Sequence, residues 1–276
     1  MRTNFRPIDL SERQAQIADL VREEGFLNVD YLASRYNVTS QTIRRDLTVI
    51  CDCGLGRRRH GGVERISSSG NLSYRSRQIL ARDAKENIAE KVRDHVPHHT
   101  ILAFSIGTTP EIVAAALLKH QNLRIFTHNL NIAMLACSNP SFEVHIAGGK
   151  VRNNDCDVMG KGMETLLSSY IFDIGIYGVA GVDEDGTLLD FTDEEVQARQ
   201  LIHKNSRKTF LVLDHSKFSR AAHVRGGQIG EATKVFCDQK PPTKIMKILD
   251  KSGCEVVLCG QTVSYTHLTL PTKRIV

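Results

Sequence analysis

Several features that would place this chain in other classes of protein are missing from its 276 residues. No apolar run approaches the ~18 residues that cross a membrane, and Met1 to Leu10 lack the apolar core of a secretion signal. The seven cysteines are an odd number, and neither Cys51/Cys53 nor Cys254/Cys259 has a zinc-binding spacing. We therefore expect a cytoplasmic protein with reduced thiols and no bound metal.

The short motifs of common nucleotide-binding and hydrolytic sites are also absent. No glycine is followed by Lys-Ser or Lys-Thr, so there is no Walker A loop, and no complete GxGxxG is present. GxSxG and HExxH do not occur, and spacing alone assigns no acid–base pair. We expect no catalytic residue and no cofactor.

Lysine is absent from the first 80 residues, which contain 13 arginines and 9 acidic residues, a balance of +4. The whole chain carries +5, so nearly all of its net charge lies in the first third. The planar guanidinium group binds phosphates and guanine edges in a bidentate way that lysine cannot match. This distribution favours a nucleic-acid-binding module at the N-terminus.

Three short helices are predicted in this module. Ser11 and Gln14 have the spacing of a capping box, Asn28 can cap a second helix, and Thr39 can cap a third. The turn before Thr39 gives the order helix, helix, turn, helix.

The third predicted helix has two unlike faces. Ile43, Leu47 and Ile50 recur at i, i+4 and i+7, which predicts a buried stripe. Polar and basic side chains gather on the other side, where a helix-turn-helix presents its recognition helix. The DNA contacts that we predict on this helix are Gln41, Thr42, Arg44, Arg45 and Thr48.

A basic hairpin is predicted next, in "GLGRRRHGGV" from Gly54 to Val63. Glycines bracket its charged centre, as in the wing of a winged helix-turn-helix. The predicted DNA contacts in this wing are Arg57, Arg58, Arg59 and His60. "SSSGN", Ser67–Asn71, is typical of a flexible segment, so we predict a DNA-binding domain over residues 1–66 and a linker over 67–80.

Residues 81–262 alternate apolar strands with amphipathic helices, which predicts an α/β domain with a mostly parallel sheet. The expected strands are Thr100–Phe104, Leu123–Thr127, Phe142–Ala147, Asp173–Val179, Thr209–Leu213 and Glu255–Leu258. The expected helices are Pro110–Lys119, Ile132–Ser138, Met163–Tyr170, Glu194–His203 and Thr243–Ser252. A ligand of such a sheet binds at the loops beyond the carboxyl ends of its strands.

The loop "SIGTTPEI", Ser105 to Ile112, follows the first of these strands. Thr109 can cap the next helix, with Pro110 at its first position, and the backbone around Gly107 can approach a phosphate. An ordinary capped turn explains the loop about as well. Helix capping likewise explains Glu195, and a surface position explains Lys217. The effector contacts that we predict are Ser105, Gly107, Thr108, Thr109, Asn129, Gly149, Gly181, Glu195 and Lys217.

The last residues have a different character. "VSYTHLTLPT", Val263 to Thr272, matches the in-frame translation of DNA that resembles a sequencing adapter. We expect residues 263–276 to be non-native and assign them no function.

The motifs "TIRRDL", "RHGG", "GTT", "AGG" and "DHSKF" occur here in that order. In this combination, residues 8–260 resemble the DeoR-type bacterial transcription regulators. The resemblance implies a winged helix-turn-helix followed by a sensor domain related to phosphosugar isomerases. It also implies a homo-oligomeric repressor that binds double-stranded operator DNA and is released by a small phosphorylated effector, sn-glycerol 3-phosphate in the most similar members. The family usually has an acidic residue where Ser105 stands and Asn where His128 stands.

Two other classes of protein fit this sequence less well than a repressor. A phosphosugar isomerase with a basic appendage would not need an arginine-faced helix and a basic wing, and it would need an acid–base pair. A non-specific nucleic-acid-binding protein would leave the sensor-like second domain unexplained.

Overall fold

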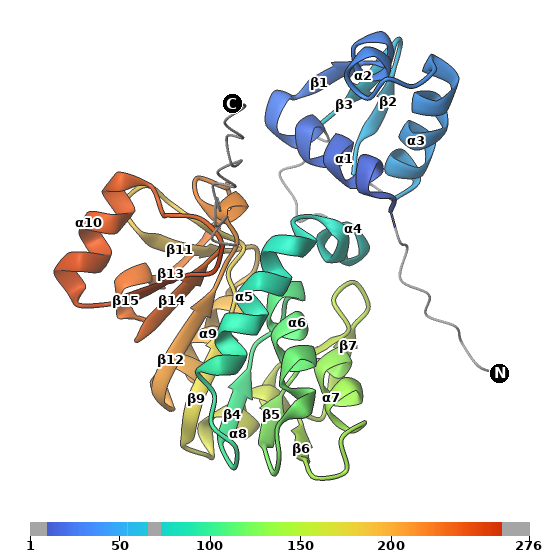
Figure 1. Ribbon diagram of the computed structural model, residues 1–276. Coiled ribbons are helices and arrows are strands. Elements are labelled where there is room, and N and C mark those ends of the chain that lie inside the picture. The colour runs from blue at the N-terminus through green and yellow to red at the C-terminus, as the bar shows by residue number, and fades with distance from the viewer. Residues whose placement is uncertain (1–9, 54, 66–72, 261–276) are drawn as a thin grey trace, which may run out of the picture.

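The computed structural model describes residues 10–53, 55–65 and 73–260 (Figure 1). The segment Ser67–Asn71 and the tail 263–276, for which we predicted flexibility and a non-native origin, lie outside these residues. A short helix, α4 (Tyr74–Ile79), lies between an N-terminal and a C-terminal part. The described end of the predicted linker is therefore helical.

The N-terminal part is a winged helix-turn-helix, as predicted. Its elements are α1 (Glu12–Glu24), β1 (Phe26–Asn28), α2 (Val29–Arg35), α3 (Ser40–Asp52), β2 (Arg57–Arg59) and β3 (Gly62–Glu64). The capping box on α1 and the caps of α2 and α3 are present at the predicted residues. β2 and β3 form the hairpin after α3, and β3 also pairs with β1.

Helix α3 is oriented by its apolar stripe. Ile43, Leu47 and Ile50 are fully buried, as predicted, in a core that includes residues of α1 and α2. Asp46 is buried as well, and its carboxylate accepts from Arg13 Nε at 2.7 Å and from Gln14 Nε2 at 2.8 Å. These bonds join α3 to α1 and hold the Asp46 carboxylate away from the exposed face that carries Arg44.

The C-terminal part contains a seven-stranded sheet in the order β15-β14-β12-β9-β4-β5-β6. Every pair of neighbouring strands in it is parallel. The strands are β4 (Ile101–Phe104), β5 (Arg124–Thr127), β6 (Glu143–Ile146), β9 (Phe172–Tyr177), β12 (Ser206–Val212), β14 (Lys234–Cys237) and β15 (Glu255–Leu258). β4 and β9 are neighbours in the sheet although four strands separate them in sequence. From β4 the chain continues outward to β5 and β6, and from β9 it continues outward in the other direction to β12, β14 and β15.

Helices cover both faces of the sheet and complete its two apolar cores. One face packs against α5 (Arg82–Asp94), α6 (Thr108–Ala116) and α7 (Leu130–Ala136). The other face packs against α8 (Lys161–Ser168), α9 (Asp193–Lys204) and α10 (Thr243–Ser252). No helix among the described residues is long and apolar enough to cross a membrane.

Some elements of this part were not predicted. Besides α5 and β14, they are the hairpin of β7 (Lys150–Arg152) with β8 (Asp157–Met159) and the small sheet of β10 (Gly181–Val182), β11 (Thr187–Asp190) and β13 (Val224–Gln228). These strands are short, and several contain glycine or charged residues, so their sequences carry little apolar periodicity.

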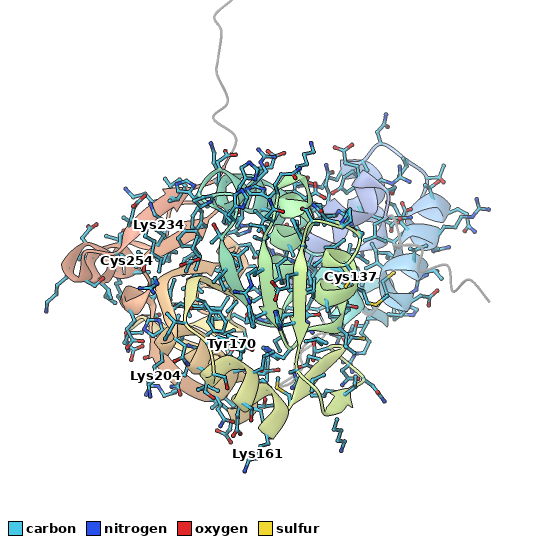
Figure 2. All side chains as sticks on the ribbon, turned by 90° about the horizontal axis from the view of Figure 1, so that it is seen from below. Cys137, Lys161, Tyr170, Lys204, Lys234 and Cys254 are labelled. Atoms are coloured by element: carbon cyan, nitrogen blue, oxygen red, sulfur yellow. The ribbon has the colours of Figure 1, made fainter. Side chains whose placement is uncertain are left out.

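The seven cysteines are all free thiols, as expected. Cys137, at the end of α7, and Cys254, before β15, lie on opposite sides of the C-terminal part (Figure 2).

Candidate functional site

Helix α3 presents an exposed basic face. Gln41, Arg44, Arg45 and Thr48 are exposed on it, and Thr48 donates its hydroxyl to the carbonyl of Arg44 at 2.9 Å. Within the described part of the chain, neither Arg44 nor Arg45 has a side-chain hydrogen bond or ion pair. Both guanidinium groups are therefore available to an external anion.

The wing lies beside this face and is joined to it. Arg58 donates from both terminal nitrogens to the carbonyl of Arg44, at 3.4 and 3.3 Å. Arg57 and Arg59 flank it and share Glu64, whose pKa is lowered by hydrogen bonding to Arg57 and then to Arg59. Glu64 neutralises only part of this charge, so the wing remains basic.

All nine residues predicted to contact DNA lie on α3 or the wing. His60 is exposed in the hairpin turn, whereas Thr42 is half-buried, with its hydroxyl 3.0 Å from that of Thr39. Figure 1 shows α3 and β2 side by side. A helix flanked by a wing with this charge fits the major groove and adjoining phosphates of DNA.

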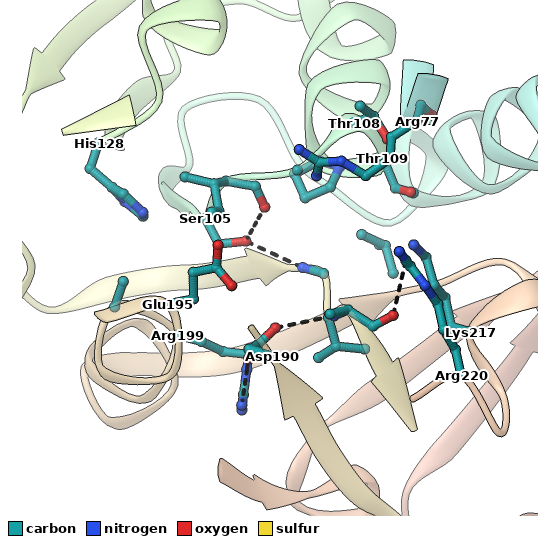
Figure 3. A pocket seen from close by; sticks show the side chains of 18 residues that line it. Arg77, Ser105, Thr108, Thr109, His128, Asp190, Glu195, Arg199, Lys217 and Arg220 are labelled. Carbon is teal, nitrogen blue, oxygen red and sulfur yellow. Dashed lines mark hydrogen bonds and ion pairs between the residues drawn. The ribbon is translucent and has the colours of Figure 1, made fainter. Parts of the chain in front are cut away.

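The C-terminal part has a pocket at the carboxyl ends of its central strands (Figure 3). Loops after β4, β5, β9 and β12 contribute to it, together with α6, α9 and α4. This is where the direction of successive connections reverses, which is the usual ligand position in an open parallel sheet. Its polar lining residues are Arg77, Ser105, Thr108, Thr109, His128, Asp190, Glu195, Arg199, Lys217 and Arg220.

One side of the pocket is rich in positive charge. Burial lowers the pKa of Lys217 to about 7, against the opposing effect of Asp214, and Arg220 lowers it further. Burial and then Arg220 lower the pKa of Arg77 to about 10. Nearby Lys85 is also buried, which lowers its pKa to about 8. These cations destabilise one another, so an anion bound among them is favoured.

Arg77 comes from α4, outside the sheet. It forms an ion pair with Asp155 in the β7–β8 hairpin, and its guanidinium carbon lies 5.6 Å from the ring centroid of Tyr74. Its carbonyl accepts from the Thr108 hydroxyl at 3.2 Å and from the Lys85 ammonium group. Helix α4 is therefore fastened to the pocket by both backbone and side chain.

Six of the nine predicted effector contacts line this pocket: Ser105, Gly107, Thr108, Thr109, Glu195 and Lys217. Both Ser105 and Glu195 also hold neighbouring loops. The Ser105 hydroxyl donates to the carbonyl of Ile106 at 3.0 Å and accepts from Gly178 N at 3.2 Å. Glu195 accepts from Arg152 and from Phe191 N, each at 3.0 Å.

Asn129, Gly149 and Gly181 do not line the pocket. Asn129 caps α7 and donates to Glu111 Oε1 at 2.8 Å, so its amide faces away. A Cβ on Gly181 would lie 2.2 Å from the carbonyl oxygen of Arg220, which indicates that this glycine permits a close backbone approach. Gly149 lies in the loop before β7.

The start of α6 differs from the prediction. The helix begins at Thr108 after Gly107, whose φ is 125°, and no side chain caps it. Thr109 and Pro110 are therefore the second and third helical residues rather than the cap and the first. The expected cap is missing because Thr109 lies inside the helix, and the hydroxyl of Thr108 is bonded to Arg77 instead. The first N–H groups of α6 consequently have no side-chain cap, as at a helix end that binds an anion.

Sequence reasoning did not assign five polar residues of this pocket: Arg77, His128, Asp190, Arg199 and Arg220. Asp190 and Arg199 form an ion pair at 2.9 Å, and the other Asp190 oxygen accepts from Ala180 N at 3.1 Å. Arg220 lies just beyond "DHSKF", which was the one available signal. Arg77 stands in the predicted linker, where nothing local points to a pocket.

A winged helix with a basic face, joined to a domain with a cationic pocket, defines a ligand-responsive transcription regulator. Comparison with known families identifies which kind. The DeoR-like helix-turn-helix domain matches residues 13–69, and the DeoR C-terminal sensor domain matches residues 80–239. The chain belongs to the DeoR family and is a transcriptional repressor with a C-terminal sugar-phosphate sensor, not an enzyme. The isomerase alternative is thereby set aside.

Relatives cover almost the whole chain. A glycerol-3-phosphate regulon repressor of Escherichia coli (strain K12) is 39% identical over 249 residues, 90% of this chain and 99% of the relative. One of Haemophilus influenzae (strain ATCC 51907 / DSM 11121 / KW20 / Rd) is 40% identical over 253 residues, 92% of this chain and 98% of the relative. Among solved structures, ribose 5-phosphate isomerase A of Methanocaldococcus jannaschii is similar with a TM-score of 0.37 and 15% identity, covering 50% of this chain and 54% of that chain.

Arg44 provides a direct test of the DNA-binding face. Because Arg44 is exposed opposite the buried stripe, Arg44→Ala should fold normally. Loss of a base contact typically costs ~1–3 kcal/mol, so operator affinity should fall about tenfold or more. Fluorescence anisotropy with labelled upstream DNA measures this, and Arg82→Ala, which removes an exposed arginine of α5, is the control. A folded Arg44→Ala protein with the parent affinity would reject the assignment.

Proposed function

We propose that this homo-oligomeric repressor binds operator DNA through α3 and the wing, and that sn-glycerol 3-phosphate or a closely related phosphate ester releases it. The observation that carries the proposal is the pocket at the α6 N-terminus, where Lys217 and Arg220 meet Arg77 of α4. In support of an oligomer, β6 is an edge strand of the described sheet and leaves Ile146 exposed.

A phosphate group complements this pocket in charge and in hydrogen bonding. It accepts hydrogen bonds from several donors at once, and guanidinium and ammonium groups stand around the pocket. The amide groups at the start of α6 add a positive partial charge. The names of the relatives at 39% and 40% identity support glycerol 3-phosphate as the ester.

Helix α4 offers a physical route from this pocket to the DNA-binding domain. Ser76 donates its hydroxyl to the carbonyl of Cys53, just after α3, at 2.6 Å. Ile79 and Leu80 pack against the core of the winged helix domain. At its other face, Tyr74 bonds to Glu111 of α6 and Arg77 pairs with Asp155. One helix of six residues thus contacts both domains.

We infer that a bound phosphate competes with Asp155 for Arg77 and so changes the position of α4. A shift of α4 would alter its hydrogen bond from Ser76 to the carbonyl of Cys53, the residue that directly follows α3. Release from DNA requires that the effector bind the DNA-free arrangement more tightly than the DNA-bound one, and the coupling must be reciprocal.

The proposal is tested on a preformed complex of the full chain with upstream DNA. sn-Glycerol 3-phosphate should dissociate the complex at a lower concentration than other phosphate esters of similar size, and glycerol should not dissociate it. Fluorescence anisotropy follows the release, with inorganic phosphate at matched ionic strength as the control. Release by glycerol as effective as by its phosphate would contradict a phosphate-reading pocket.

Lys217 predicts proton uptake on effector binding. Its pKa is about 7 in the free pocket, because burial and the charges of Arg220, Lys85 and Arg77 lower it against the opposing effect of Asp214. A bound phosphate raises this pKa, so at pH 8 the complex takes up protons and affinity strengthens as the pH falls from 9 to 7. Lys85, with a pKa of about 8, contributes to the same uptake.

Calorimetry at pH 8 in two buffers of different ionisation enthalpy measures this uptake. Lys217→Arg keeps the positive charge but does not titrate here, so it should bind effector with smaller uptake than the parent. Equal uptake by the two proteins would show that Lys217 is already charged before binding.

Ser76 tests the role of α4. Ser76→Ala removes the bond to the Cys53 carbonyl and the contact with the Ser73 hydroxyl, and Ser76 is not among the residues that line the pocket. Effector binding to the DNA-free protein should stay near the parent value, while the ratio of effector affinities without and with operator should fall severalfold toward one. Ser168→Ala, which removes a hydroxyl bonded to a backbone carbonyl within α8, is the matched control. An unchanged ratio in Ser76→Ala would remove α4 from the route.

A further inference from the structure

His128 lies at the end of β5, with its side chain fully buried in the wall of the effector pocket. Neither ring nitrogen has a hydrogen-bond partner among the described residues. Figure 3 shows the ring directed toward the interior of the pocket, on the side of Ser105 and Glu195. Buried polar atoms are normally bonded, so this ring requires an explanation.

The protein holds this imidazole neutral and in place. Burial, and then the charge of Arg152, lower the pKa of His128 to about 3. A neutral imidazole has one N–H donor and one acceptor nitrogen. The backbone on both sides is fixed, because the His128 carbonyl accepts from Val158 N at 2.7 Å and Asn129 N donates to the Thr127 hydroxyl at 3.0 Å.

Neighbouring polar groups on this wall are already engaged. The hydroxyl of Ser105 both donates and accepts a hydrogen bond, and Glu195 uses one oxygen for Arg152 and the other for Phe191 N. Neither satisfies His128. Among these three side chains, the imidazole alone retains its full hydrogen-bonding capacity for a ligand.

The pocket has cationic side chains on one side and a neutral polar side chain, His128, on the other. Lys217 and Arg220 lie at the opposite side from His128, with Arg77 and the start of α6 nearer to them (Figure 3). A neutral ring adds nothing comparable to these cations in holding a doubly charged phosphate. It is matched to a hydroxyl group, which both donates and accepts.

We propose that His128 is a specificity-determining residue of the effector pocket, which hydrogen-bonds to a hydroxyl on the uncharged part of the ligand while the cations hold its phosphate. The ligand class is therefore a hydroxylated phosphate ester, in which the hydroxyl lies on the carbon chain away from the phosphate. This inference rests on the proposed function, because it assumes that the ester occupies this pocket.

The test compares two ligands that differ only in hydroxyl groups, sn-glycerol 3-phosphate and n-propyl phosphate. Calorimetry on the full chain without DNA measures both. The parent should bind sn-glycerol 3-phosphate at least about tenfold more tightly, because an unmet buried donor and acceptor penalise the deoxy ligand. In His128→Leu this preference should fall to severalfold or less, with n-propyl phosphate bound at least as tightly as by the parent.

Stability distinguishes this role from a structural one. Replacing an unbonded buried polar group with an apolar group of similar size is neutral or stabilising, so ligand-free His128→Leu should melt at or above the parent temperature. His128→Gln restores a donor and an acceptor and should recover part of the preference, and it serves as the test if the Leu variant does not fold. His120→Leu is the matched control, since His120 is also buried with one unbonded ring nitrogen but lies outside the pocket. It should keep the parent preference.

The outcomes separate the inference from the proposed function. If the parent binds both esters but His128→Leu and, where needed, His128→Gln keep its full preference, His128 does not read the hydroxyl and the inference is overturned, while the phosphate pocket stands. If the parent binds neither ester, the proposed effector class and this inference both fail. Loss of preference in His128→Leu alone, with binding of n-propyl phosphate retained, supports both.

Discussion

The accumulation of positive charge at the carboxyl edge of the sheet is the constraint on which the regulator depends. Four cations act on one another there: Arg77 of α4, Lys85 of α5, and Lys217 and Arg220, which both lie in the segment between β12 and β13. Asp214 and Asp155 compensate only part of this charge. Burial of like charges lowers their pKa values, and this free energy is recovered when an anion binds. Binding of a phosphate therefore stabilises the pocket by relieving the repulsion among these cations.

The same constraint bears on the route that we propose between the two domains, which runs through the short helix α4. In this proposal, charge attracts the effector to Arg77, and α4 transmits a change because both domains contact it. Glu111 illustrates how firmly the pocket side is built: burial raises its pKa to about 7, and Asn129, Asn131 and Tyr74 all bond to it. On the other face the attachment is mainly Ser76 and two apolar side chains.

Features of the structure that depend on residues close together in sequence could be predicted, whereas those that depend on tertiary packing could not. The N-caps and the two faces of α3 arise within one helix turn, and Ser11, Asn28 and Thr39 were placed correctly from spacing alone. The order of most strands and helices followed from apolar periodicity, although α5, β14 and the strands of the two smaller sheets were not predicted. Asn129 shows where prediction from sequence fails at the pocket. His128 and Asn129 are adjacent polar residues, and the path of the backbone determines that His128 lines the pocket and Asn129 does not. Arg77 could not be found, because its role is created by where α4 docks.

The resemblance to DeoR-type regulators implied an amide at His128 and a carboxylate at Ser105, and the structure relates the two positions. Both residues line the same wall of the pocket. The Ser105 hydroxyl donates to the Ile106 carbonyl and accepts from Gly178 N. A carboxylate at that position would add negative charge near an incoming phosphate and could bond a ligand hydroxyl itself. Because the Ser105 hydroxyl is already bonded within the protein, the proposed hydrogen bond to the uncharged end of a ligand comes from the His128 imidazole. A neutral ring does so without repelling the phosphate, so charge attraction and hydroxyl selection are carried by separate residues at the two ends of one pocket.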